Sequence, residues 1–294
     1  MHRRKFITNS IITAFGATIP TKIMSNQLLN HLTQNTPKMP VLFMGHGNPM
    51  NAIEDNQFTK AWHQLAKNIP TPKAIVIISA HWETKGETQV FVGEKPKMIY
   101  DMYGFPQKLY EVKYPVQGNP ELAKEIQQKV NYTSIALNHN WGLDHGAWSV
   151  LVKMFPEATI PCFQLSLNTT RDLQWHYDFA KQLAFLRNKG VLIMGSGNIV
   201  HNLRYIHSFN DPAPDWALEF DQKSTQFMNE GNHQALINYE KLGKAALISI
   251  NSAEHYIPLL YALALQEKGD EISYTNQLVD NTLLGVGMRC VRVG

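Results

Sequence analysis

The stretch VLFMGHGNPM, residues 41–50, joins an apolar run to a histidine that stands between two glycines. Two later stretches follow the same pattern, AIVIISAHW at 74–82 and VLIMGSGNIVH at 191–201. Short, continuous apolar runs rich in β-branched residues predict strands that are buried on both faces of a sheet. The histidines that come at or just after the ends of these predicted strands are His46, His81 and His201.

Amphipathic segments separate the predicted strands. Residues 55–68 have helical spacing with Asp55 as the expected N-cap, and Asn119 followed by Pro120 predicts a helix over 119–130. Further helices are expected at 145–155, 170–190, 215–230, 232–242 and 253–269, and further strands at 88–93, 160–168 and in two segments near the C-terminus. This alternation predicts an α/β fold with a central, largely parallel or mixed sheet flanked by helices. No linker composition divides 38–294, so one domain is expected.

The strand-end histidines predict where a site would form. In open α/β sheets, ligands bind at the carboxyl ends of the parallel strands, so His46, His81 and His201 are expected on one rim of the sheet. Neutral imidazole is the commonest protein ligand for metal ions. The pattern therefore predicts a metal site at the carboxyl ends of the strands.

Two acid–histidine pairs stand at the starts of predicted helices. Asp144-His145 lies in GLDHGAWSVL, where the pair forms either an acid–base site or a helix cap beside a structural histidine. Glu254-His255 opens a strongly apolar helix, where either side chain is placed to reach the strand rim. An acid that complements the helix dipole is the alternative reading for Glu254.

Composition and missing motifs exclude several functions. The chain has 294 residues, 44% of them hydrophobic, and its net charge of +3 comes without a basic stripe, which argues against a nucleic-acid partner. The sequence contains no G-x-S-x-G elbow, phosphate-binding loop, dinucleotide fingerprint or H-E-x-x-H motif. Serine hydrolases, nucleotide-dependent enzymes and zincin proteases are therefore not expected.

The N-terminus carries features of an export signal. Arg3 and Arg4, with Phe6 close behind, precede an uncharged apolar stretch over 11–20, an arrangement that resembles a twin-arginine signal. We therefore expect residues 1–37 to be a signal and tether and the protein to be periplasmic. The stretch is too short to span a membrane stably, so no stable membrane insertion is expected after processing. The alternative is a basic N-terminal tail on a cytoplasmic protein.

Six motifs in this order carry a resemblance to a known family. They are GHGNPM, SAHWET, YDMYGFPQKLYEVKYP, GLDHGAWSVL, GSGNIVHNLR and AEHYIPLLYALA, and they run from about Met39 to the C-terminus. Together they resemble the class III extradiol ring-cleavage dioxygenases of the LigB type. The branch they resemble most is that of the DOPA 4,5-dioxygenases.

This resemblance implies roles for particular residues. His46 and His81 match the metal ligands of the family at the strand ends, and His255 fits the third ligand of this branch better than Glu254. His201 matches a histidine that acts as acid–base or as a fourth ligand, and His145 matches one that lines the substrate pocket. The expected substrate contacts are Asp144, Tyr103 and Phe105.

The implied function is a dioxygenase that opens the ring of a small, DOPA-like catechol with O2, next to its two hydroxyls. One divalent metal is implied, and an all-histidine set leaves both Fe(II) and Zn(II) open. Two alternatives stand beside this function: a zinc hydrolase with a metal-bound hydroxide, and a non-catalytic, Memo-like module that binds a metal or a partner. The sequence leaves open the identity of the catechol and whether the chain forms an oligomer.

Overall fold

The computed structural model describes residues 37–205, 213–277 and 286–294, and the statements below concern these residues. A six-stranded sheet forms the centre, in the order β11-β12-β1-β10-β2-β8. Its strands are β1 (Val41–Gly45), β2 (Ala74–Ser79), β8 (Cys162–Gln164), β10 (Val191–Gly197), β11 (Ile272–Thr275) and β12 (Cys290–Val293). The segment over 1–37, expected to be an export signal and tether, lies outside the described residues except for Pro37.

The central strands run parallel and end together. β10 pairs in parallel with β1, with Gly197 opposite Gly45, and with β2, with Ser196 opposite Ser79. β12 is antiparallel to both β1 and β11, which makes the sheet mixed. The carboxyl ends of β1, β10 and β2 therefore meet at one rim, as the sequence predicted.

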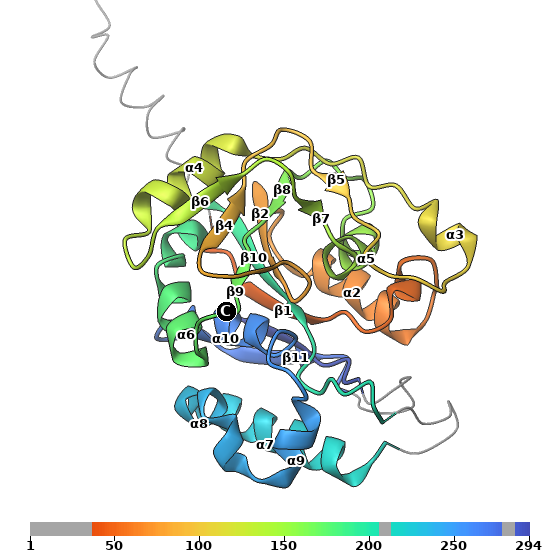
Figure 1. Cartoon of the computed structure of the whole chain (residues 1–294), viewed down its shortest axis with the longest axis vertical. Coiled ribbons are helices and arrows are strands. Elements are labelled where there is room, and N and C mark those ends of the chain that lie inside the picture. The colour runs from red at the N-terminus through yellow and green to blue at the C-terminus, as the bar shows by residue number, and fades with distance from the viewer. Residues whose placement is uncertain (1–36, 206–212, 278–285) are drawn as a thin grey trace, which may run out of the picture. The chain divides into compact units, whose positions relative to one another are not determined.

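Alternate residues of each strand face opposite sides of the sheet, because side chains along a strand point up and down in turn. Phe43, Val76 and Ile193 lie in a core that includes helices α6 (Leu173–Lys181) and α10 (Ile257–Ala264). Met44, Ile77 and Met194 lie in a second core with helices α2 (Gln57–Lys67) and α5 (His145–Met154). Helices thus cover both faces (Figure 1), and the predicted α/β architecture is confirmed.

The remaining elements surround this core. The other helices are α3 (Gln107–Tyr110), α4 (Pro120–Lys129), α7 (Asp215–Asn229), α8 (His233–Ile237) and α9 (Lys244–Ser249). Short 3₁₀ turns are η1 (Pro49–Ala52), η2 (Ala184–Lys189) and η3 (Tyr239–Leu242). Three two-stranded sheets pair β3 (Glu83–Thr84) with β9 (Leu167–Asn168), β4 (Thr88–Phe91) with β6 (Ile135–Asn138), and β5 (Lys97–Met98) with β7 (Gly142–Leu143).

The structure corrects the predicted start of α2. Its N-cap is Asn56 and not Asp55, because the Asn56 side chain accepts hydrogen bonds from the backbone N–H groups of Phe58 and Thr59. Asp55 instead pairs with the Lys153 ammonium at 2.8 Å. The helix itself is where its apolar spacing predicts it.

Three long predicted elements are shorter or divided. The strand expected over 160–168 is two strands, β8 and β9, which belong to different sheets. The helix expected over 170–190 is α6 followed by η2, which ends at Gly190 with a positive φ of 77°. The helix expected over 253–269 begins at Ile257, so Glu254 and His255 precede it.

The helices formed by the described residues are short in comparison with the thickness of a membrane. None of them is both long enough and apolar enough to cross one.

Candidate active site

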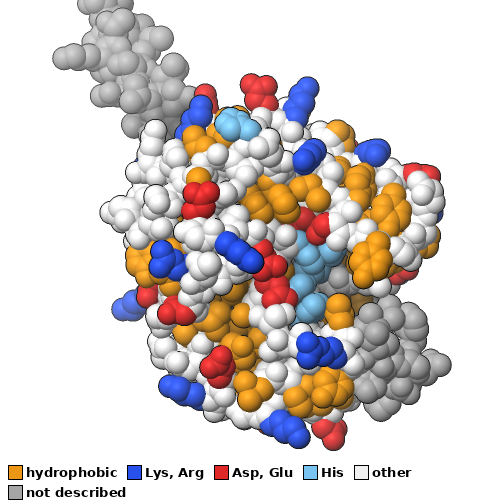
Figure 2. All heavy atoms as spheres, viewed as in Figure 1, with side chains coloured by type: hydrophobic (Ala, Val, Ile, Leu, Met, Phe, Trp, Pro, Cys, Tyr) orange, Lys and Arg blue, Asp and Glu red, His pale blue; other side chains and the backbone are white. Residues whose placement is uncertain are grey.

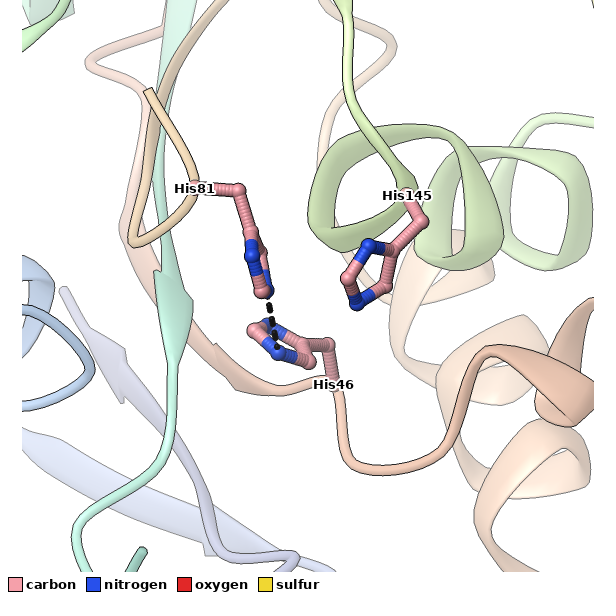
Figure 3. Close-up of side chains that lie close together, drawn as sticks. All are labelled: His46, His81 and His145. Carbon is pink, nitrogen blue, oxygen red and sulfur yellow. Dashed lines mark hydrogen bonds between the residues drawn. The ribbon is translucent and has the colours of Figure 1, made fainter. Parts of the chain in front are cut away.

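Five histidines come together at the rim where β1, β2 and β10 end. The ring centroids of His46, His81 and His255 lie 5.0–5.3 Å apart in every pairing. His201 stacks on His255 at 3.6 Å, and His145 lies 3.9 Å from His81. Figure 3 shows His46, His81 and His145 pointing toward one another from the end of β1, the loop after β2 and the start of α5.

The distance between two ring nitrogens fits a shared metal ion. Nε2 of His46 lies 3.3 Å from Nε2 of His81, the contact that is dashed in Figure 3. Two nitrogens bound to one tetrahedral zinc at about 2.0–2.1 Å lie about 3.3–3.4 Å apart. The two rings are thus already placed as neighbouring ligands of one ion.

The hydroxyl of Ser196 determines which nitrogen of His46 carries the proton. Ser196 donates its only hydroxyl proton to the carbonyl of Gly146, with an oxygen–oxygen distance of 2.6 Å. The same hydroxyl oxygen lies 3.0 Å from Nδ1 of His46 and must therefore accept a hydrogen bond from it. Nδ1 is the protonated nitrogen, and Nε2 keeps a free lone pair that faces the site.

A carboxylate oxygen lies beside Nδ1 of each of the two other rings, His255 and His81. Nδ1 of His255 lies 3.0 Å from Oε1 of Glu254, which also accepts a hydrogen bond from the Ser252 hydroxyl. Nδ1 of His81 faces Oδ2 of Asp101 at 3.5 Å. Histidines that bind metals commonly donate their second ring N–H to such acceptors, which orients the ring.

Burial keeps these rings neutral. Desolvation lowers the pKa of His46 and His255 well below the usual value, and it lowers the pKa of His81 to about 3 and of His201 to about 4. The neighbouring histidines lower these pKa values further. Only the neutral ring can bind a metal, so the site is prepared for one at neutral pH.

A close backbone approach holds His255 against β10. A side-chain carbon added at Gly197 would stand 2.1 Å from the carbonyl oxygen of His255, so the strand end accepts only glycine there. The same carbonyl accepts a hydrogen bond from the backbone N–H of Asn198 at 2.9 Å. The terminal glycine of β10 thus lets His255 reach a rim to which β1 and β2 bring the other two rings.

His145 is fixed by the loop that follows β5. The carboxylate of Asp101 accepts a hydrogen bond from the backbone N–H of His145 at 2.8 Å, and its other oxygen lies 3.0 Å from Nδ1 of the same residue. The second contact is close but poorly directed for a hydrogen bond. Burial raises the pKa of Asp101, yet the contacts with His145 outweigh it and hold that pKa below its usual range.

The histidines form the bottom of a cavity of about 420 Å³. Figure 2 shows pale blue histidine side chains in a hollow with orange hydrophobic groups around it. The other lining residues are Gly47, Asn48, Pro49, Asp101, Met102, Tyr103, Phe105, Leu203 and Val286. Of the expected substrate contacts, Tyr103 and Phe105 therefore lie at the cavity, and Tyr103 is 92% exposed at its edge.

Asp144 does not lie at the cavity wall. Its side chain is fully buried, and it accepts hydrogen bonds from Ser79, from Gln164 and from the backbone N–H of Ala147 at the start of α5. Asp144 therefore caps α5, and the substrate contact expected from the sequence has no support in the structure.

The two residues considered for the third ligand face different cavities. His255 lines the cavity of the histidines, whereas Glu254 lines a neighbouring cavity of about 320 Å³. The carboxylate of Glu254 meets the back of the His255 ring at Nδ1. The placement of His255 is therefore the one that matches a ligand.

Asp101 is the residue that the sequence reasoning missed. It lies in the motif YDMYGFPQKLYEVKYP, in which the sequence predicted roles only for Tyr103 and Phe105. Its partners His81 and His145 are distant in sequence, and the loop has no periodicity that would place them together. The one available signal was an acidic residue among aromatic ones, next to a predicted site.

Comparison with known proteins agrees with this geometry. Residues 23–285 match the catalytic LigB subunit of aromatic ring-opening dioxygenase. A 4,5-DOPA dioxygenase extradiol of Escherichia coli K12 is 39% identical over 84% of this chain and 92% of its own length. The protein of the same name from Beta vulgaris is 34% identical over 83% of this chain and 93% of its own.

A solved structure has the same fold. The crystal structure of an uncharacterized protein from Escherichia coli K12 matches with a TM-score of 0.74 and 35% identity, over 87% of this chain and all of that one. The family match over residues 23–285 includes five of the six strands of the central sheet and the five histidines of the rim. The chain therefore belongs to the LigB family, within the DOPA-dioxygenase branch of the class III extradiol dioxygenases, and is a metal-dependent ring-cleavage enzyme.

Proposed function

We propose that His46, His81 and His255 hold the metal, and that the enzyme uses it to open a DOPA-like catechol with O2. One observation carries this assignment: the three ring centroids lie 5.0–5.3 Å apart in every pairing, and an oxygen lies beside Nδ1 of each ring, which leaves Nε2 for the metal. The ring of His201 is instead stacked on that of His255, with 3.6 Å between the ring centroids. The zinc-hydrolase and Memo-like alternatives are not favoured, since the relatives above carry the name of a dioxygenase.

Fe(II) is the metal that fits the chemistry best. Bound by three protein ligands, it would lower the pKa of the catechol hydroxyls and mediate electron transfer between the catechol and O2. Zinc has no redox chemistry of its own. The neutral, buried nitrogens of the site are suited to either ion, so the reaction with O2 is what favours iron.

His201 is placed to move the protons of the reaction. Its ring lines the cavity and stands parallel to His255, with an angle of 5° between the two planes. Burial lowers its pKa to about 4, so it is neutral at pH 7 and can accept a proton from a catechol hydroxyl. The protonated ring can then return that proton to an oxygen of the reacting group.

His145 orients the substrate from the opposite side. It lines the cavity next to His81, and Asp101 fixes its position through the backbone N–H. A ring held in this way can donate a hydrogen bond to a catechol oxygen without first being ordered. Preorganised donors of this kind stabilise negative charge as it develops.

The cavity edge supplies the contacts for the aromatic ring. Tyr103 and Phe105 lie on the loop that carries Asp101, and both line the cavity. Aromatic pairs of this kind contribute about 0.5–1.5 kcal/mol beyond their buried area. The name of the relatives, 4,5-DOPA dioxygenase extradiol, supports a DOPA-like substrate.

Metal analysis and oxygen uptake test this function. Protein purified without oxygen and loaded with Fe(II) is expected to bind one ion, consume O2 with catechols and give a coloured ring-opened product. The zinc-loaded protein serves as the control and should bind its ion without consuming O2. Hydrolase activity with zinc, together with no oxygen uptake with iron, would contradict the proposal.

We also propose that residues 1–37 direct export by the twin-arginine route. The supporting observation is Arg3-Arg4 followed by Phe6 and an apolar stretch. In a bacterial host with this pathway, the full chain should appear in the periplasmic fraction, and the double change Arg3→Lys with Arg4→Lys should retain it in the cytoplasm. Equal distribution of the two forms would contradict the proposal.

A further inference from the structure

The charge of the cavity wall is one-sided. Among the described residues that line the cavity, Asp101 is the only acidic one. Within the described residues, no lysine or arginine lines the cavity. A ring substituent bound here would therefore meet a carboxylate and no cation.

The sequence next to the lining residues carries little positive charge. The internal segments outside the described residues, 206–212 and 278–285, contain no lysine or arginine in the sequence. The basic residue closest in sequence to a lining residue is Arg204, which follows Leu203. Its side chain is exposed and is not part of the cavity wall.

A second carboxylate adds to the negative potential. Glu254 lies directly behind the ring of His255, with 3.0 Å between Oε1 and Nδ1. The carboxylate of Asp101 likewise lies 3.5 Å from Nδ1 of His81 and 3.0 Å from Nδ1 of His145. The fixed charges that act on these rings are negative, as the geometry of the wall indicates.

We propose that the cavity selects catechols by the charge of the ring substituent, with Asp101 as the residue that favours an ammonium group. DOPA carries such a group beside its carboxylate, whereas a catechol whose substituent carries a carboxylate alone is disfavoured. This inference rests on the proposed function, since it concerns the substrate of that site. Asp101 is suited to this role because it lines the cavity and 23% of its side chain is exposed. Its Oδ2 faces Nδ1 of both His145 and His81, whereas its Oδ1 accepts a hydrogen bond from the backbone N–H of His145 and has a second lone pair for a further donor.

The bound metal does not remove this preference. All catechols place the same two oxygens on the metal, so its charge acts equally on each member of a matched series. The substituent alone differs, and the proposal requires that it lie near Asp101 on the cavity wall. Opposite and like charges about 4–7 Å from a carboxylate at a protein surface differ by more than about 1.4 kcal/mol, or tenfold in rate or affinity.

A matched series of three catechols tests the proposal. Their ring substituents are aminoethyl, ethyl and carboxyethyl groups, which are cationic, neutral and anionic at pH 7. We expect kcat/KM to fall in that order, with a ratio of at least about tenfold between the first and the last. The ratio should shrink at high salt, because salt screens the partly exposed carboxylate. An acid that reacts as well as the amine would overturn the proposal.

Binding to the metal-free protein separates this inference from the proposed function. The probes are tyramine and 3-(4-hydroxyphenyl)propionate, two monophenols that differ in the charge of the substituent. Tyramine is expected to bind at least about ten times more tightly. If this preference holds while no catechol is cleaved, the charge selection stands and the dioxygenase proposal fails. If neither probe binds, or both bind equally, the charge selection is overturned.

Two variants assign the effect to one residue. Asp101→Asn should reduce the amine-to-acid ratio to near one in both experiments. The ratio compares two substrates on one preparation, so any loss of metal through the contact with His81 cancels. Arg204→Gln is the matched control and should leave the ratio unchanged. A ratio that stays above tenfold in Asp101→Asn, or one that changes only in Arg204→Gln, would overturn the role of Asp101.

Discussion

The bottom and the edge of the cavity are built in opposite ways. At the bottom, His46 and His81 follow strands β1 and β2, and His255 is held against the end of β10. Their rings lie beside Ser196, Asp101 and Glu254, respectively. His46 is 2% exposed and His255 is 7% exposed. At the edge, Tyr103 is 92% exposed and Leu203 is 50% exposed.

This difference separates two functions of the site. Ligand positions at the bottom are determined by the register of the sheet, so they can change only if the fold changes. Side chains at the edge belong to loops that tolerate substitution. The chemistry of the family therefore resides in the sheet, and the choice of substrate resides in the loops. The following predictions test this division.

The largest effect is expected from His46→Ala. Removal of a ligand at the bottom should abolish stoichiometric metal binding and lower kcat/KM by at least about a thousandfold, or about 4 kcal/mol. Metal analysis and oxygen uptake measure the two effects. Tyr103→Ala is the matched change at the edge and should keep the metal, with KM raised only a few-fold. Full metal occupancy in His46→Ala would show that the ligand set is wrong.

Glycines give the same contrast in stability. Gly197→Ala would place a carbon 2.1 Å from the carbonyl oxygen of His255 and should lower the free energy of unfolding by about 3 kcal/mol. Gly104 has a positive φ of 78° and no atom within 4 Å of an added carbon, so Gly104→Ala should cost only about 1 kcal/mol. Urea unfolding of both variants compares the two costs. Equal values would mean that the bottom is no more rigid than the edge.

His145→Ala is expected to separate binding of the metal from catalysis. Because His145 stands beside His81 without being needed as a ligand, the variant should keep its metal while kcat falls by about a hundredfold. Metal content and kcat are measured on the same sample. Loss of the metal would instead make His145 a ligand, since its donor atoms lie within 4.8 Å of those of His46 and His81.

The smallest effect is expected from a lower pH, as a loss of stability with each pH unit. The pKa of His81 is lowered to about 3 and that of His201 to about 4, whereas a histidine in the unfolded chain has a pKa of about 6.5. The unfolded state of the metal-free protein therefore binds more protons below pH 6.5, and stability should fall as the pH drops from 6.5 toward 4. Each ring contributes at most about 1.4 kcal/mol per pH unit. Thermal unfolding of the metal-free protein at several pH values should show this loss, and a midpoint independent of pH would contradict it.

Much of this bottom was predictable from the sequence. Buried strands have a clear signature, and the rule that ligands bind at the carboxyl ends of parallel strands is enough to predict that His46 and His81 lie together. His255 was harder to place, because its approach depends on the lack of a side chain at Gly197. Only the resemblance to a family favoured His255 over Glu254 as the third ligand.

The roles of Asp101 and Asp144 and the start of α2 depend on contacts that local sequence patterns do not encode. Asp101 meets its partners across loops, and Asp144 fits equally well as a helix cap or as an active-site acid until its donors are seen. The boundary errors have a similar cause. Asp55 and Asn56 are both good caps, and only the geometry of the turn selects Asn56.

The contact between Gly197 and the carbonyl of His255 has a consequence for how this family diversifies. Because the backbone at residue 255 is anchored to β10, a different side chain at that position would start from the same point in space. Exchange of imidazole for carboxylate would therefore alter the ligand set without rearranging the chain. A single codon would then be enough to change metal preference, and evolution could explore that change before any other part of the protein adapts.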